Sequence, residues 1–163
     1  MSCGFAGALV EKGGCDPLLK RASDLSEEVV LMDADRVCGI DHLISAVIHA
    51  RRAFDRGSNA SNTLGMEVIL YASGERQISK AKKKMGLHQG TERVALVLLG
   101  PPDADIDDVL EKLELRRDDS LLDCTLEKGA AFGLDENEVH TLGEGFLQEL
   151  ILEKVAFVDL LKR

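Results

Sequence analysis

The side chains best suited to bind a metal or attack a substrate are scattered singly along this chain. The four cysteines form no C-x-x-C pair and have no histidine at metal-site spacing; they are Cys3, Cys15, Cys38 and Cys124. Glycine-rich phosphate loops, H-E-x-x-H and G-x-S-x-G are also absent from the sequence. We therefore predict no metal, no cofactor and no enzyme active site. An even number of cysteines permits disulfides, but we interpret them as reduced, buried thiols of a cytoplasmic protein.

Basic side chains at helical spacing could bind an anion. In a helix predicted over about residues 40–54, apolar residues form one side: Ile40, Leu43, Ile44, Val47 and Phe54. Polar and basic residues recur opposite them, at His42, Ser45, His49, Arg52 and Arg56. A helix predicted over residues 75–85 turns Ile78, Ala81 and Met85 inward and Arg76, Lys80, Lys83 and Lys84 outward. The alternative is two ordinary solvated helix faces.

Lying side by side, these two basic stripes would form one anion-binding surface. Residues 36–93, which contain both stripes, have only Phe54 and Tyr71 as aromatic residues. Base stacking is therefore poorly supported, and contacts with nucleic acid would be to phosphate. The candidate phosphate-binding residues are Arg52, Arg56, Arg76, Lys80, Lys83 and Lys84.

Arg51 differs from the other basic residues because the helical wheel places it in the apolar face. A buried guanidinium needs a partner, and Glu67, in the apolar stretch of residues 66–71, is the obvious candidate. We predict a structural ion pair between Arg51 and Glu67 rather than a catalytic one, because no nucleophile or second base accompanies them.

The last predicted helix, residues 145–161, is apolar on nearly all sides. A wide stripe suits the core and comprises Phe146, Leu150, Ile151, Phe157, Val158 and Leu161. A second ridge of Leu152, Ala156 and Leu160 runs along the other side, next to Glu149 and Glu153. Such a helix is either buried on two sides or docks to another protein, and we name this ridge as a candidate protein-binding surface.

The distribution of charge supports separate surfaces for separate partners. The 163 residues carry a net charge of −9, made up of −4 in residues 1–35, +5 in residues 36–93 and −10 in residues 94–163. The acidic total therefore does not exclude a nucleic-acid partner. An apolar content of 45% without a long apolar run excludes a disordered chain and a membrane span.

The pattern of elements predicts one α+β domain over residues 1–163, helix-rich, with a small mixed or antiparallel sheet packed against a helical centre. Strands are expected at residues 3–10, 29–32 and 93–99. Helices are expected at about residues 17–24, 40–54, 61–72, 75–85, 103–113, 135–142 and 145–161. Residues 121–132 are ambiguous, with a strand and turn as one interpretation.

The central segment resembles the PRPK-binding protein family, whose members are the kinase-regulating subunit of the KEOPS complex. The resemblance rests on LISAVIHARRAF at residues 43–54, NTLGMEVILYASG at residues 62–74, ERQI at residues 75–78, Ala81 and MGL at residues 85–87. LEKVA at residues 152–156 is similar to the family's C-terminal helix. The ASGERQI string is its most specific element.

The resemblance implies a non-catalytic adaptor, of archaeal type, with a helix-rich α+β fold. Such a subunit binds the atypical kinase/ATPase of KEOPS and helps to recruit tRNA, by its 3′ CCA end, for threonylcarbamoyladenosine modification. The basic residues above would then contact tRNA, and Leu152, Ala156 and Leu160 would contact the kinase. We expect a monomer in isolation, without a membrane partner. The alternative is a small-molecule-binding domain or enzyme with a site near Arg51 and Glu67.

Overall fold

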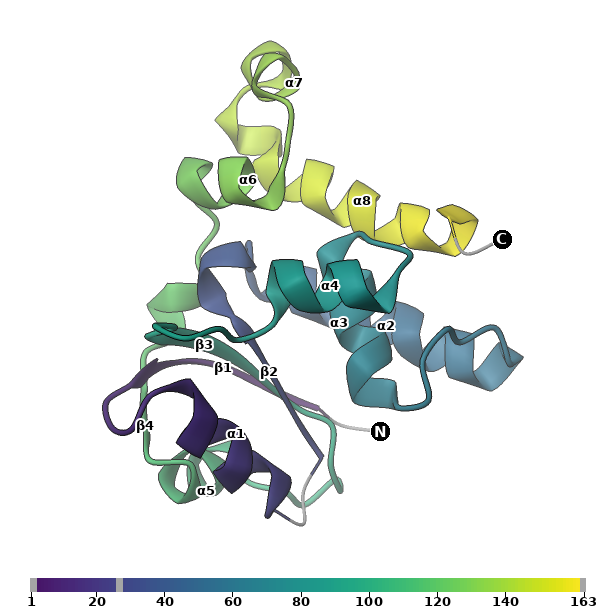
Figure 1. Cartoon of the computed structure of the whole chain (residues 1–163). Helices are drawn as coiled ribbons and strands as arrows, with labels where there is room; N and C mark the ends of the chain where they lie inside the picture. The colour runs from purple at the N-terminus through teal and green to yellow at the C-terminus, as the bar shows by residue number, and fades with distance from the viewer. Residues whose placement is uncertain (1–2, 26–27, 162–163) are drawn as a thin grey trace.

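The structure is a computed structural model that describes residues 3–25 and 28–161. Four short strands are interspersed with helices, which follow one another without a strand between β2 and β3 and after β4 (Figure 1). In chain order they are β1 (Gly4–Val10), α1 (Cys15–Ser23), β2 (Val29–Asp33), η1 (Ala34–Arg36), α2 (Ile40–Arg56), α3 (Leu64–Ser73), α4 (Ile78–Met85), β3 (Arg93–Leu98), α5 (Ile106–Lys112), β4 (Leu115–Arg117), η2 (Asp119–Leu122), α6 (Leu126–Phe132), α7 (Glu136–Leu142), η3 (Glu144–Phe146) and α8 (Leu147–Leu161), where η marks 3₁₀-helices.

The four strands form one antiparallel sheet in the order β2-β3-β1-β4. In the centre, Phe5 of β1 lies opposite Val97 of β3, which in turn lies opposite Val30 of β2. Helices cover both faces, so β3 is buried on both sides. Its even-numbered residues Val94 and Leu96 pack with α1 and α5, and alternate residues pack with the central helices. The predicted α+β class with an antiparallel sheet is confirmed.

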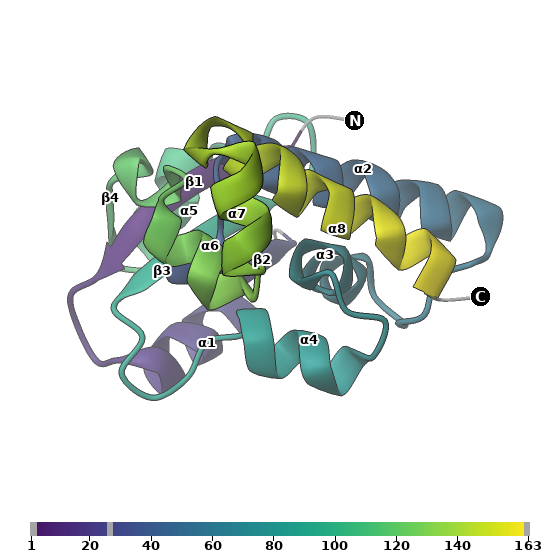
Figure 2. The same ribbon diagram turned by 90° about the horizontal axis from the view of Figure 1, so that it is seen from above.

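The helical centre is built around α3, which lies between α2 and α4 (Figure 2). The hydroxyl of Thr63 caps the start of α3 by accepting from the backbone N–H of Met66 at 3.2 Å. Gly57 and Gly74 end α2 and α3 in the left-handed region, where a residue with a Cβ would be strained. α8 crosses over α2 and α3, and α6 packs beneath its start.

The structure differs from the sequence prediction at α6 and β4. Residues 126–132 form helix α6 rather than a strand and turn, capped by the hydroxyl of Thr125 and ended by Gly133 in the left-handed region. The three-residue strand β4 was not predicted, because a strand this short carries no measurable alternation and depends on pairing with β1. None of the described helices is long and apolar enough to span a bilayer.

Candidate partner-binding surfaces

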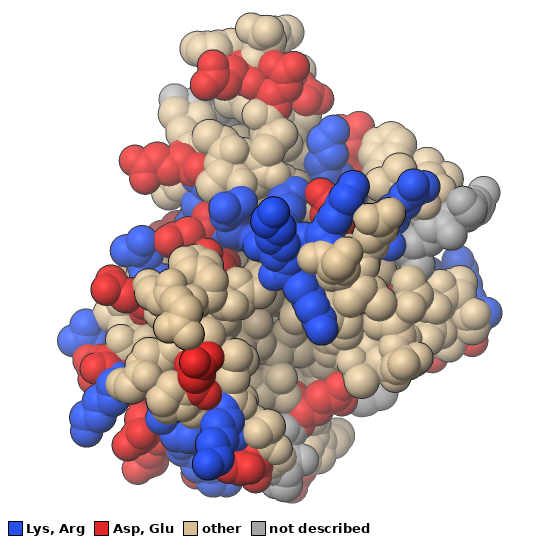
Figure 3. All heavy atoms as spheres, in the orientation of Figure 1, with Lys and Arg blue, Asp and Glu red and all other residues tan. Residues whose placement is uncertain are grey.

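Basic side chains surround a hollow of about 330 Å³ next to α4, which we call the basic hollow. It is lined by Arg36 of η1, Glu75 before α4, and Lys80, Lys83 and Lys84 of α4. Figure 3 shows Lys and Arg gathered at the middle of this face of the molecule. With four cations to one carboxylate among its lining side chains, the hollow is suited to an anion.

Lys84 is the most constrained cation of the basic hollow. Its side chain is half-buried, and its Nζ lies 3.7 Å from the centre of the Phe132 ring of α6. Burial lowers the pKa of the Lys84 amine, Glu75 opposes this, and the charges of Arg36 and Lys154 lower it further. A bound phosphate would oppose the effect of burial by favouring the charged form of this amine.

The structure separates the two predicted basic stripes. Because α3 lies between α2 and α4, the exposed Arg52 and Arg56 of α2 do not lie beside the α4 lysines. The expectation of one continuous surface made by both stripes was therefore wrong. Arg76 is exposed just before α4. Sequence reasoning missed Arg36, which lies far from α4 in the chain and has no helical pattern around it.

The predicted polar stripe of α2 was wrong at both histidines. His42 is fully buried, and its Nδ1 accepts a hydrogen bond from the Cys38 backbone N–H at 3.0 Å. Its Nε2 lies 2.7 Å from the Ala72 carbonyl oxygen, so the network assigns a neutral ring that donates from Nε2. Ile40, predicted to face inward, is exposed. The wheel assumed one buried side, whereas α2 is covered by α3 and also by α8.

His49 lies where α8 crosses α2. Its ring stacks on Tyr71 with centroids 5.4 Å apart, and its Nδ1 lies 3.0 Å from Oδ2 of Asp159. The Tyr71 hydroxyl donates to the other carboxylate oxygen of Asp159. Burial, and then the carboxylate of Asp159, raise the pKa of Tyr71 above its usual value. These contacts connect the C-terminal end of α8 to both α2 and α3.

Burial of His42 predicts a loss of stability in mild acid. Burial lowers its pKa from 6.5 to about 4, and the charges of Lys84 and Lys128 act in the same direction against the Ala72 hydrogen bond. Between these two pH values the imidazole of His42 is protonated in the unfolded chain but not in the folded chain. The free energy of unfolding is therefore unaffected by the titration of His42 above pH 6.5 and decreases as the pH falls towards 4. The total decrease is about 3 kcal/mol, because one pKa unit corresponds to about 1.4 kcal/mol.

Urea unfolding of the protein and of His42→Gln at several pH values measures this contribution. We expect the free energy of unfolding of the native chain to fall more steeply between pH 6.5 and 4 than that of the variant. Equal slopes would contradict the assignment of a buried neutral imidazole.

Glu67 of α3 is a fully buried carboxylate with a structural task. It accepts from the backbone N–H of Ala60 at 3.1 Å, from that of Ser61 at 2.9 Å and from the Ser61 hydroxyl at 2.7 Å. These bonds close the loop between α2 and α3. The ion pair of Glu67 with the half-buried Arg51 stays a prediction. Because the Glu67 carboxylate already accepts these hydrogen bonds from the loop, it is not available to a ligand. This argues against the alternative of a small-molecule site near Arg51 and Glu67.

Replacement of Glu67 should be among the most destabilising changes in the helical centre. We expect Glu67→Ala to lower the free energy of unfolding by about 3 kcal/mol, because it leaves buried donors without an acceptor. Glu67→Gln keeps one acceptor oxygen and should lower the free energy of unfolding by less. A double-mutant cycle with Arg51→Met measures the predicted ion pair. Urea unfolding is the measurement, with the exposed Glu111→Ala as control; equal stability of Glu67→Ala and the control would contradict this role.

Helix α8 presents apolar side chains to solvent along one side. Its buried residues are Leu147, Leu150, Ile151, Val155 and Val158. Phe146, Phe157 and Leu161, predicted to be in the core, are exposed. On the predicted ridge, Leu152 is half-buried, and Ala156 and Leu160 are exposed. The exposed apolar surface of α8 is therefore wider at its C-terminal end than predicted, and we call Ala156, Phe157, Leu160 and Leu161 the α8 ridge.

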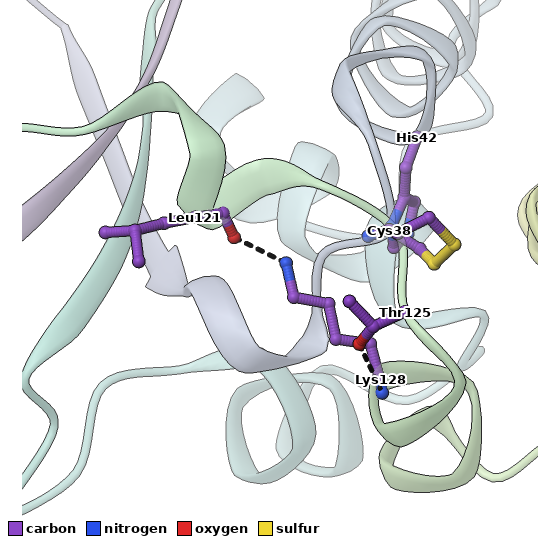
Figure 4. Close-up of a disulfide and its surroundings, with 6 residues drawn as sticks. Cys38, His42, Leu121, Thr125 and Lys128 are labelled. Atoms are coloured by element: carbon purple, nitrogen blue, oxygen red, sulfur yellow. Dashed lines mark hydrogen bonds between the residues drawn. A yellow bond between two sulfur atoms is a disulfide. The ribbon is translucent and has the colours of Figure 1, made fainter.

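The interpretation of all four cysteines as reduced thiols was wrong for two of them. Cys38 and Cys124, separated by 86 residues in sequence, form a disulfide (Figure 4). Cys3 and Cys15 are free. Packing of α6 against η1 brings the pair together, and spacing in the sequence carries no sign of it. Among the described residues, no group of three or more His, Cys, Asp or Glu side chains could hold a metal ion.

The fold and its surfaces define an α+β domain that presents a basic hollow and an apolar helix, which are features of a binding protein. Residues 16–157 match the model of the family described as kinase binding protein CGI-121, and the chain belongs to this family. The chain is similar to the KEOPS complex subunit Cgi121 of Pyrococcus abyssi. The two are 28% identical over 145 residues, which cover 85% of this chain and 76% of the relative.

Proposed function

We propose that this protein is a non-catalytic, cytoplasmic adaptor subunit of a KEOPS complex. In this proposal the protein binds and regulates the atypical kinase/ATPase through the α8 ridge and Leu152. The basic hollow contacts tRNA phosphates and helps to bring in the 3′ CCA end for threonylcarbamoyladenosine modification. Membership of the kinase-binding family supports the first part, and the charge of the basic hollow supports the second.

The observation that carries the kinase contact is the exposure of Phe157 and Leu160 on α8, at 45% and 54%. Large apolar side chains side by side at a helix end are costly to leave in water, and a docking partner would cover them. The neighbouring Asp159 is tied to His49 and Tyr71, so this end of the helix is held in place for docking. Pre-positioned side chains lose less entropy on binding.

Size-exclusion chromatography with light scattering tests the proposal directly. We expect the chain alone to elute as a monomer and to form a stable one-to-one complex with the KEOPS kinase of the same organism, but not with an unrelated kinase. A tRNA transcript should bind more tightly than the same transcript without its 3′ CCA nucleotides. Separate elution of the chain and the kinase would contradict the adaptor role, and equal binding of both transcripts would contradict recognition of the CCA end.

A further inference from the structure

The Cys38–Cys124 disulfide is connected to the basic hollow by helix α6. Cys38 precedes α2, and Cys124 lies two residues before the start of α6. A helix of seven residues has almost no stability of its own, so the position of α6 depends on its tertiary anchors. The disulfide is the covalent anchor among them.

Two side chains of the basic hollow are supported directly by α6. The Arg36 guanidinium donates from Nη1 to the carbonyl oxygen of Ala131, and the amine of Lys84 lies over the Phe132 ring. The same ring meets the edge of His42, whose Nδ1 accepts from the backbone of Cys38. The disulfide, α6 and both cations therefore form one contiguous set of contacts. A displacement of α6 would take away the support of Arg36 and Lys84 together.

The remaining anchors of α6 are noncovalent. Lys128 donates from Nζ to the carbonyl oxygen of Leu121, and Thr125 caps the helix by accepting from the backbone N–H of Lys128 at 3.2 Å (Figure 4). Phe132 and Leu134 pack with Cys38 and the start of α8. These contacts would hold α6 near its place after reduction, with more freedom. We therefore expect graded weakening of the hollow rather than unfolding.

We propose that the Cys38–Cys124 disulfide controls the affinity of the basic hollow for nucleic-acid phosphates, so that its reduction weakens binding. A dithiol would supply two electrons and two protons: the S–S bond breaks, Cys38 and Cys124 become thiols, and the dithiol becomes a disulfide. Cys124 is partly exposed and Cys38 is buried, so a reductant reaches the sulfur of Cys124 first. This inference rests on the proposed binding of tRNA by the basic hollow.

Fluorescence anisotropy with labelled tRNA, on the full chain before and after reduction, tests the inference. Dithiothreitol is suitable because it is uncharged and does not compete for an anion site. We expect reduction to weaken binding by at least about fivefold, the lower end of typical coupling between two sites. Cys38→Ser/Cys124→Ser should bind as the reduced protein does in both conditions. Cys3→Ser/Cys15→Ser, which lacks the free cysteines, should respond as the native chain does.

Phe132→Leu separates control of the hollow from a general loss of stability. The variant keeps apolar bulk in α6 and removes the ring beneath Lys84, so its affinity should change less on reduction, whereas its melting temperature should still fall. Circular dichroism of the reduced native chain should show that it remains folded, so the comparison holds even if the serine variant does not fold. Equal tRNA affinity before and after reduction would overturn the inference alone. Absence of binding in both states would overturn the proposed tRNA function and this inference with it.

Discussion

Charge reversal of Lys80, Lys83 and Lys84 together should lower the affinity for tRNA by about 100-fold at physiological salt. All three line the basic hollow, where positive charge exceeds negative charge. Neutralising a phosphate releases counterions, so the slope of log affinity against log salt should also decrease, by about one for each phosphate that the variant no longer neutralises. Titration of labelled tRNA into Lys80→Glu/Lys83→Glu/Lys84→Glu at several salt concentrations measures both quantities.

A matched control reverses three basic residues away from α4. Lys12, Lys20 and Arg116 are exposed and lie on or near α1 and β4. Their reversal gives the same change in net charge, so a loss of affinity equal to that of the α4 variant would mean that overall charge alone governs binding. Arg52→Glu/Arg56→Glu tests the α2 residues separately. We expect a smaller effect because α3 separates them from the hollow.

Leu160→Glu should weaken kinase binding by about 30-fold or more, because it places a charge in the apolar part of the proposed interface. The Leu160 side chain is more than half exposed, so the isolated variant should fold as the native chain does. Leu152→Glu tests the predicted contact nearer the start of α8. Because Leu152 is half-buried, the stability of this variant must be measured as well. Isothermal titration calorimetry with the KEOPS kinase measures both affinities.

Leu142→Glu is the control for an exposed leucine elsewhere. Leu142 of α7 is 44% exposed and lies outside α8. We expect this variant to bind the kinase with unchanged affinity. Unchanged binding by Leu160→Glu, with the variant still folded, would show that the kinase docks on another surface.

Local pattern was enough to predict most of the elements. The apolar run at residues 93–99 predicted β3, and the helices predicted at residues 40–54 and 61–72 correspond to α2 and α3, each followed by a glycine in the left-handed region that ends the helix. The lysines of α4 and the apolar excess of α8 are also local properties. The sequence therefore sufficed for the α+β class and for two candidate binding surfaces.

Burial was predicted less well because a helical wheel describes one helix in isolation. α2 is covered by α3 on one side and by α8 on another, so His42 is fully buried and His49 partly buried although their spacing matched a polar stripe. The same double packing leaves Ile40 exposed. On α8, Phe157 was assigned to the core for the same reason, whereas it lies at the surface.

The sequence by itself determined the local choices: the positions of β1, β2, β3 and most helices, the class of fold and the uneven distribution of charge. These follow from backbone sterics and from periods of two or about four residues, which act between near neighbours. Only the tertiary structure decided which distant residues share a surface. It placed Arg36 beside the lysines of α4, joined Cys38 to Cys124 and inserted α3 between the two basic helices, because contacts between distant segments depend on how whole elements pack together.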